Sequence, residues 1–202
     1  MYADRGLYWE QERTLIVADL HLGKTGHFRR SGIAMPQSIY KADLQRLIAL
    51  LHLTGAKRLL IAGDLTHSSA NRELELFRKW RNDLPGLQID LVRGNHDILG
   101  PEWYHDCGIT LHDREWRFGG FRFVHDPADA GSHEEFVFSG HVHPAITIRG
   151  GGRQSLTFPC FYYHGHQVWL PAFSHFTGTC QVRPNRSDTV YAVTPTGIVQ
   201  VH

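Results

Sequence analysis

Apolar residues in the first half of the chain alternate between short continuous runs and stripes at helical spacing. The runs at residues 14–18, 58–62 and 89–92 are largely apolar, which is typical of strands buried on both faces. Residues 36–55 and 72–81 carry apolar side chains at the three- and four-residue intervals of an amphipathic helix. This alternation of strand and helix predicts a parallel sheet with right-handed helical crossovers.

The second half of the chain has the pattern of short, mostly antiparallel strands. Residues 116–118 and 121–123 flank Gly119 and Gly120, a spacing typical of a two-residue hairpin. Further strands are predicted at residues 135–139, 145–148, 156–163, 168–170, 190–193 and 198–201. No linker-like stretch separates the halves, so we expect a single domain over residues 1–202 with a two-sheet α/β sandwich.

Five short polar motifs each follow one of the predicted strands. They are Asp19-Leu20-His21, Gly63-Asp64, Gly94-Asn95-His96-Asp97, His125 and Gly140-His141-Val142-His143. In open α/β sheets, ligands bind beyond the carboxyl ends of the strands. We therefore expect all five motifs to gather along one edge of the fold.

The spacing within two of these motifs suits metal coordination. Asp19 and His21 are two residues apart, as are His141 and His143, so on extended backbone each pair points the same way. Each pair can then grip a cation from one side. The glycines that accompany the motifs would let the backbone turn sharply or approach the site closely.

Asp64 and Asn95 supply the remaining kinds of ligand. A carboxylate has two oxygens, so Asp64 can bridge two cations about 3.5–4 Å apart. The amide carbonyl of Asn95 adds a neutral oxygen. Taken singly, each motif has a plainer explanation, such as a turn for Gly-Asp or an Asx turn for Asn-His-Asp. Their joint occurrence after five strands favours a two-metal site that hydrolyses a phosphate ester.

The composition of the chain excludes few classes of function. A formal net charge of +1 gives no overall basic field, although bound cations would add positive charge where a phosphate sits. Three cysteines without a CxxC spacing argue against a disulfide framework or a cysteine zinc site. The first thirteen residues lack an apolar signal-peptide core, and no apolar stretch is long enough to span a bilayer. We therefore expect a cytoplasmic protein with no membrane partner.

The same five motifs resemble those of the calcineurin-like metallophosphoesterases over about residues 14–143. This resemblance implies a four-layer α/β sandwich with two mixed sheets. It also implies two divalent metal ions, most commonly manganese, with iron or zinc as alternatives. By position, one metal would be held by Asp19, His21, Asp64 and His143, and the second by Asp64, Asn95, His125 and His141.

The resemblance leaves His96 as the catalytic histidine. A protonated His96 would stabilise charge on the phosphoryl group or protonate the leaving oxygen. Asp97 would orient the His96 ring by fixing its tautomer or supporting its charged form. No serine or cysteine nucleophile is needed, so no covalent intermediate is expected.

A narrower resemblance covers nearly the whole chain. Its segments match the bacterial ligase-associated DNA damage response endonucleases at residues 18–24, 28–33, 125–127, 140–144, 159–161, 170–173 and 176–178. Ser174 and His175 depart from the glycine expected after residues 171–173. The resemblance implies an endonuclease acting on single-stranded DNA in DNA repair, with a DNA ligase or helicase as possible partners in a repair complex.

Three basic residues follow the first motif. Lys24, Arg29 and Arg30 could contact the flanking phosphates of a nucleic acid, or they could form a solvated basic turn. The leading hypothesis is a metal-dependent phosphodiesterase, a nuclease in particular. The alternatives are a small-molecule nucleotide or nucleotide-sugar phosphoesterase or pyrophosphatase, and a non-catalytic scaffold of a repair complex.

Overall fold

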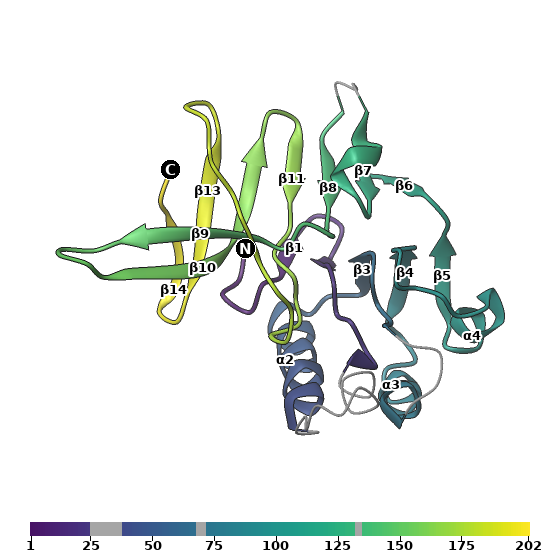
Figure 1. Cartoon of the computed structure of the whole chain (residues 1–202). Coiled ribbons are helices and arrows are strands. Elements are labelled where there is room, and N and C mark those ends of the chain that lie inside the picture. The colour runs from purple at the N-terminus through teal and green to yellow at the C-terminus, as the bar shows by residue number, and fades with distance from the viewer. Residues whose placement is uncertain (25–37, 68–71, 132–134) are drawn as a thin grey trace.

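The computed structural model describes residues 1–24, 38–67, 72–131 and 135–202. Within these ranges two β-sheets pack against each other, and the first has the strand order β1-β2-β3-β4-β5 (Figure 1). Its strands are β1 (Leu7–Trp9), β2 (Thr14–Val17), β3 (Arg58–Ala62), β4 (Gln88–Val92) and β5 (Ile109–His112). Strands β2 to β5 are parallel, which confirms the predicted sheet, and β1 adds an antiparallel edge.

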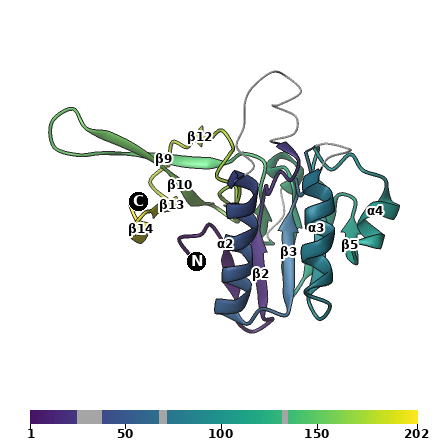
Figure 2. The ribbon, with the colours of Figure 1, turned by 90° about the horizontal axis from the view of Figure 1, so that it is seen from below.

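Helices cover one face of this first sheet. Helices α2 (Ser38–Thr54) and α3 (Arg72–Asn82) lie side by side across it, as Figure 2 shows from below. They confirm the two predicted amphipathic helices. Helix α2 ends before Gly55, whose φ of 60° suits a residue without a side chain just past a helix. A short helix, α4 (Pro101–Asp106), leads into β5.

The second sheet is built from the rest of the chain. Its described strands are β6 (Glu115–Phe118), β7 (Phe121–Val124), β8 (Val137–Ser139), β9 (Pro144–Arg149), β10 (Ser155–His164), β11 (Gln167–Trp169), β12 (Cys180–Gln181), β13 (Thr189–Thr194) and β14 (Gly197–Gln200). The order is β12-β9-β10-β11-β8-β7-β6, with β13 and β14 joined through β10. Strand β8 pairs in parallel with both β7 and β11, so this sheet is mixed rather than purely antiparallel.

Four apolar clusters define the layers. One lies between the helices and the first sheet, and a second, including Ile16, Leu60 and Phe161, lies between the two sheets. The outer face of the second sheet carries smaller clusters and the 3-10 helix η1 (Pro127–Ala130). The two mixed sheets are therefore as expected, whereas the described residues place only η1 where a fourth, helical layer was expected.

Several short elements have no counterpart in the sequence prediction. These are β1, α4, β5, η1 and β12, each six residues or fewer. Runs of this length hold too few repeats for a period to be recognised, and they form because neighbouring strands or loops pair with them. The strand expected from residue 135 begins at Val137.

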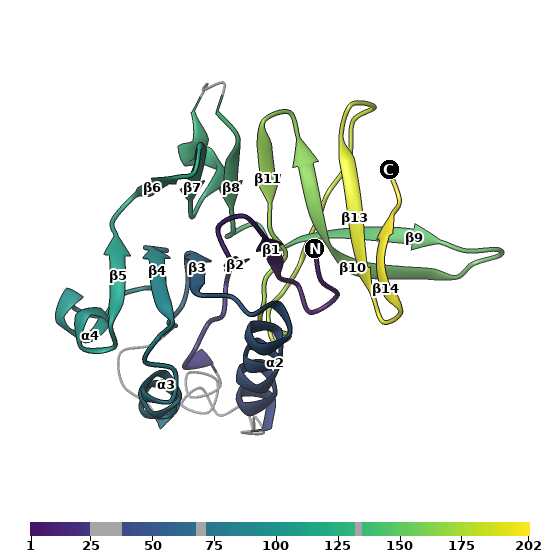
Figure 3. The ribbon, with the colours of Figure 1, turned by 180° about the vertical axis from the view of Figure 1, so that it is seen from behind.

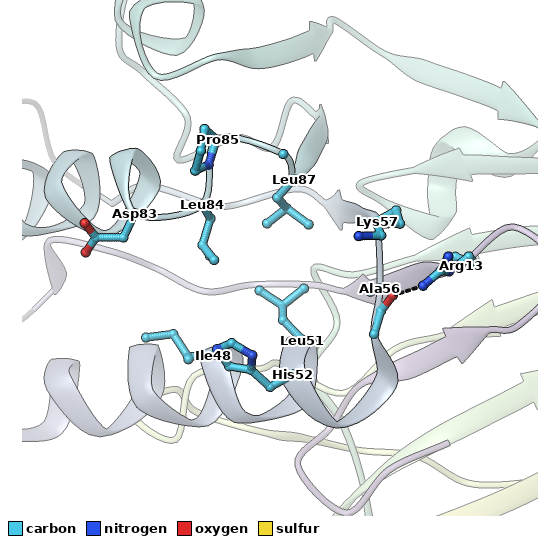
Figure 4. A pocket seen from close by; sticks show the side chains of 12 residues that line it. Arg13, Ile48, Leu51, His52, Ala56, Lys57, Asp83, Leu84, Pro85 and Leu87 are labelled. Atoms are coloured by element: carbon cyan, nitrogen blue, oxygen red, sulfur yellow. Dashed lines mark hydrogen bonds between the residues drawn. The ribbon is translucent and has the colours of Figure 1, made fainter.

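A cavity of about 370 Å³ lies between the ends of α2 and α3 (Figure 4). Leu51, Leu84 and Leu87 form part of its wall, and Arg13 and Lys57 stand at its edge. These two basic residues precede β2 and β3, so the cavity lies at the amino ends of the strands, away from the predicted site.

No described helix is long and apolar enough to cross a membrane.

The packing between the sheets makes a direct prediction for Phe161. Its side chain is fully buried between the sheets, whereas Phe136 is 40% exposed. Phe161→Ala should lower the free energy of unfolding by about 3–5 kcal/mol, because it removes buried area and leaves a cavity. Phe136→Ala, the matched control, should change it by less than about 1 kcal/mol. Urea denaturation would measure both, and equal losses would contradict this layering.

Candidate metal centre

The predicted ligands lie at the carboxyl ends of five strands. In the first sheet, Asp19 and His21 follow β2, Asp64 follows β3 and Asn95 follows β4. In the second sheet, His125 follows β7, and the His141–His143 motif follows β8. The two sheets are tied together here, because the amide of residue 173 donates to the carbonyl of residue 18 at 2.7 Å. The expectation of one shared edge is therefore confirmed.

Most of these ligand residues have unusual backbone geometry. Among the described residues, seven non-glycine positions have φ between 48° and 66°. Five of the seven are predicted ligands: Asp19, His21, Asp64, His141 and His143. Side chains rarely adopt this left-handed region, and clusters of such residues occur at functional sites where the surroundings hold them in place. The positive φ values therefore identify this edge of the sheets as a functional site, whatever residue types occupy it.

Main-chain hydrogen bonds hold the turned backbone. Past the end of β2, the amide of Asp19 donates to the carbonyl of Gly63 at 3.1 Å, and that of His21 donates to Asp64 at 2.9 Å. The ladder between β2 and β3 thus continues beyond both strands. The backbone of each loop is fixed by the other loop, which accounts for how the unfavourable torsions persist.

All three motif glycines are needed because other groups come close to them. A Cβ placed on Gly63 would lie 1.9 Å from Nδ1 of His125, and one on Gly94 would lie 2.1 Å from Oδ1 of Asp64. One on Gly140 would lie 2.6 Å from the carbonyl oxygen of Ala62. No side chain fits at any of these positions. The expected role of these glycines in close approach is therefore confirmed.

The first group of ligand atoms comes from Asp19, His21 and His143, whose donor atoms lie within 4.8 Å of one another. Nδ1 of His143 lies 3.0 Å from the carbonyl of Gly178, so the ring proton resides there and Nε2 keeps its lone pair. That Nε2 lies 3.3 Å from Nε2 of His21 and 3.6 Å from the Asp19 carboxylate. Lone pairs converging in this way suit a cation between them.

The second group contains Asp64, Asn95, His125 and His141. Nδ1 of His125 lies 3.3 Å from the carbonyl of Ala62, which leaves Nε2 as the acceptor. Nε2 then faces Oδ1 of Asn95 at 2.9 Å and Nδ1 of His141 at 3.1 Å. An unprotonated nitrogen and a carbonyl oxygen repel each other at this distance, and a cation bound between them removes the repulsion. The donor set therefore fits a second metal ion.

Asp64 lies between the two groups. Its Oδ1 accepts a hydrogen bond from the backbone amide of His96 at 2.9 Å. Its Oδ2 lies 3.5 Å from Nε2 of His125 and 3.9 Å from Nδ1 of His21, which are ring nitrogens of one histidine from each group. Burial, together with a smaller contribution from the charge of the nearby Asp19, raises the pKa of Asp64 to about 7. A buried carboxylate of this kind favours any partner that neutralises its charge.

Burial also affects the histidines of the site. It lowers the pKa of His21 to about 2, with a smaller effect from the positive charge of Lys24, so His21 is neutral at physiological pH. Burial acts in the same direction on His143, but the hydrogen bond and charge of Asp19 outweigh it and raise that pKa. The pKa of His96 is lowered by burial and by Lys24. Neutral imidazole is the form that binds metal.

Asp97 does not contact its expected partner. Its Oδ1 accepts from the amide and hydroxyl of Thr66, at 2.8 and 3.1 Å, and its Oδ2 accepts from the amide of Gly94 at 2.9 Å. The carboxylate is buried and points into the loop rather than at the His96 ring. We therefore revise its role: Asp97 holds the backbone that carries Asn95 and His96.

The structure adds residues that the sequence reasoning passed over. The ring of His67 lies against the ring of His96, with centroids 4.2 Å apart. A cavity of about 320 Å³ opens beside the second group, and Arg93 and Arg114 stand in its wall. Tertiary packing brings Arg114 to the site. The positions of Arg93, directly before Gly94, and of His67, three residues after Asp64, are weak sequence indications.

Of the three residues predicted to contact the substrate, the structure describes only Lys24. Lys24 is half-buried, and the charges of Asp64 and Asp19 act on its amine, so it lies beside the site. Arg29 and Arg30 lie outside the described residues.

Comparison with known proteins agrees with this geometry. Residues 12–172 match the family model of the calcineurin-like phosphoesterases. The crystal structure of the Pseudomonas putida nuclease MPE is similar to the chain, with a TM-score of 0.83 and 32% identity over 100% of this chain and 94% of that one. Curated protein sequences contain no match. The chain belongs to the calcineurin-like phosphoesterases, and it is a metal-dependent phosphoester hydrolase.

The raised pKa of Asp64 predicts that metal binding competes with a proton. Below pH 7 the metal-free carboxyl group is protonated, so a metal ion must displace that proton. Affinity for Mn²⁺ should therefore fall by about tenfold or more from pH 8 to pH 6. Calorimetry in buffers of different ionisation enthalpy would measure both affinity and proton release. If the affinity did not change with pH and no proton were released, Asp64 would not be a metal ligand with a raised pKa.

The contacts of Asp97 predict a structural effect rather than a shift in acid–base behaviour. Asp97→Ala leaves the Gly94 and Thr66 amides without their buried acceptor, so unfolding free energy should drop by about 1–3 kcal/mol. Metal affinity at the group containing Asn95 should weaken as well. Urea denaturation and metal titration test this. Unchanged stability together with a displaced pH optimum of turnover would instead restore Asp97 as the partner of the His96 ring.

Proposed function

We propose that this protein is a two-metal nuclease that hydrolyses phosphodiester bonds in single-stranded DNA, with Mn²⁺ as its preferred metal. The observation that carries the proposal is the position of Asp64, whose Oδ2 lies within 3.9 Å of a histidine ring nitrogen from each group. We assign Asp19, His21, Asp64 and His143 to one metal, and Asp64, Asn95, His125 and His141 to the other. We also treat residues 1–202 as one domain, because strands up to Gln200 belong to the two sheets.

Divalent cations held by these residues would supply Lewis-acid activation of water and of the phosphoryl oxygens. The protein supplies the geometry. The turned backbone aims the ligand side chains inward, and hydrogen bonds to Gly178 and Ala62 fix the tautomers of His143 and His125. Fixed ligands need little reorganisation when a substrate binds.

We assign to His96 the proton transfer or charge stabilisation at the phosphate. Its ring is partly exposed beside the ligands, and its backbone amide is anchored to Asp64 at 2.9 Å. Burial lowers its pKa in the resting protein, so the imidazole is neutral there. The negative charge of a bound phosphodiester favours the protonated form. A protonated ring can then donate to the leaving oxygen.

A nucleic acid is favoured as substrate by the similarity to a nuclease over the whole chain. Lys24, Arg93 and Arg114 stand where they could contact phosphates on either side of the cut. A small-molecule nucleotide or nucleotide-sugar phosphoesterase needs the same metal centre but fewer basic side chains around it.

A non-catalytic scaffold would not require the complete set of metal ligands. A role in DNA repair with a DNA ligase or helicase, and a cytoplasmic location, stay predictions.

Substitutions at Asp64 and His96 separate metal binding from turnover. Asp64→Asn removes the bridging charge, so it should abolish both tight Mn²⁺ binding and hydrolysis. His96→Ala leaves the ligands intact, so it should keep the metals and lower kcat by about 10²–10⁴-fold. Elemental analysis and turnover of single-stranded DNA and of a small phosphodiester provide the readouts.

Full hydrolysis by a metal-free protein, or by the His96→Ala variant, would contradict this mechanism. Hydrolysis of the small diester with no cleavage of DNA would favour the small-molecule alternative. If the purified protein contained no metal and gained no activity from added manganese, the scaffold would be favoured.

A further inference from the structure

A two-stranded arm extends from the metal centre. The arm consists of β9 and β10 and reaches beyond the rest of the second sheet, as Figures 1 and 3 show from opposite sides. Strand β9 begins at Pro144, the residue directly after His143. Its other end, Arg149, is six residues beyond this ligand, on the order of 20 Å at the rise of a strand. The arm is therefore a fixed extension of the site.

The two faces of the arm differ in chemistry. Strand pairing sets Thr147 opposite Thr157 and Arg149 opposite Ser155 on one face, which is polar. The hydroxyls of the two threonines are 2.8 Å apart. On the other face, Ile146 packs against the apolar cluster on the outer side of the second sheet. The outer part of the polar face, including Arg149, is exposed.

Strand β12 widens the polar face. It pairs in parallel with β9, and the side-chain amide of Gln181 donates to the hydroxyl of Thr147 at 3.0 Å. The next residue, Val182, is buried in the apolar cluster, so Arg183 turns to the same side as Gln181. Arg183 is exposed. Two arginines, from separate segments, thus stand on one surface of β12, β9 and β10.

The segment that carries this face has charged side chains of one sign. The sequence contains twenty Asp and Glu residues, yet none of them occurs among residues 136–187. The charged residues there, apart from histidine, are four arginines: Arg149, Arg153, Arg183 and Arg186. No carboxylate within this segment neutralises them. Although the net charge of the whole chain is only +1, the segment that follows the metal ligands of β8 is basic.

We propose that the polar face of β12, β9 and β10 binds the phosphate backbone of the nucleic-acid strand cut at the metal centre. The face is named here by Thr147, Arg149, Thr157, Gln181 and Arg183. Arginine is suited to phosphate because its planar guanidinium donates two parallel hydrogen bonds, and hydroxyl and amide groups add neutral donors. No acidic side chain within residues 136–187 adds repulsion of the phosphates. This inference rests on the proposed nuclease function and specifies how the strand is held.

The test uses the double variant Arg149→Ala/Arg183→Ala and the control Arg117→Ala. Arg117 is an exposed arginine on β6 that pairs with Glu115 and Glu135. Binding of a fluorescent 24-nucleotide single strand is measured by anisotropy over a range of salt concentrations, in EDTA so that the strand stays intact. Hydrolysis of bis(4-nitrophenyl) phosphate by the Mn²⁺-loaded proteins is measured separately.

The double variant should bind the strand about tenfold more weakly at low salt. The slope of log K against log salt should become shallower by about 1.4, since each lost phosphate contact on a single strand contributes about 0.7. Small-diester hydrolysis and melting temperature should stay unchanged, and the control should match the parent protein. Parental affinity and salt slope in the double variant would overturn the inference. Failure of every protein to hydrolyse the diester would instead overturn the proposed function, and the binding result would stand by itself.

Discussion

The metal centre depends on a backbone that turns into the left-handed region as the chain leaves each strand. Extended backbone was expected to point Asp19 and His21 the same way, but both are left-handed, as are His141 and His143. The turns, rather than strand alternation, therefore set the directions of these side chains. The torsions are unfavourable for residues with side chains. They are held by hydrogen bonds between neighbouring loops, such as that from His21 to the carbonyl of Asp64. The rigidity of two packed sheets is thereby transmitted to the ligand atoms.

A second constraint acts on the protonation of those atoms. Carbonyls of Gly178 and Ala62 receive the ring protons of two histidines, so the lone pairs of the rings face inward. Burial keeps His21 neutral and makes the charge of Asp64 unfavourable in the metal-free protein. The site therefore presents inward-facing histidine lone pairs beside a buried carboxylate. Such a site is stabilised most by a bound metal ion.

Much of this centre could be predicted from the sequence because buried parallel strands have a simple pattern. Continuous apolar runs located β2, β3 and β4, and the motif after each run then fell at one edge. The glycines at residues 63 and 94 were informative for the same reason, since close packing there excludes a side chain.

The remaining features depend on tertiary contacts that leave no period in the sequence. Strand β5 and helix α4 are too short to show one. The acceptor role of Asp97 toward Thr66 joins two loops that are 31 residues apart in the chain. The polar face of the arm likewise depends on the pairing of β12 with β9, which only the folded chain reveals.

The most direct test of the central claim is anomalous diffraction from crystals of the protein loaded with Mn²⁺. Two manganese peaks are expected per chain, about 3.5–4 Å apart, as in other two-metal sites. The carboxylate of Asp64 should lie between them, with the group of Asp19 on one side and the group of His125 on the other. A single peak, or two peaks that do not share Asp64, would show that Asp64 does not bridge two metal ions.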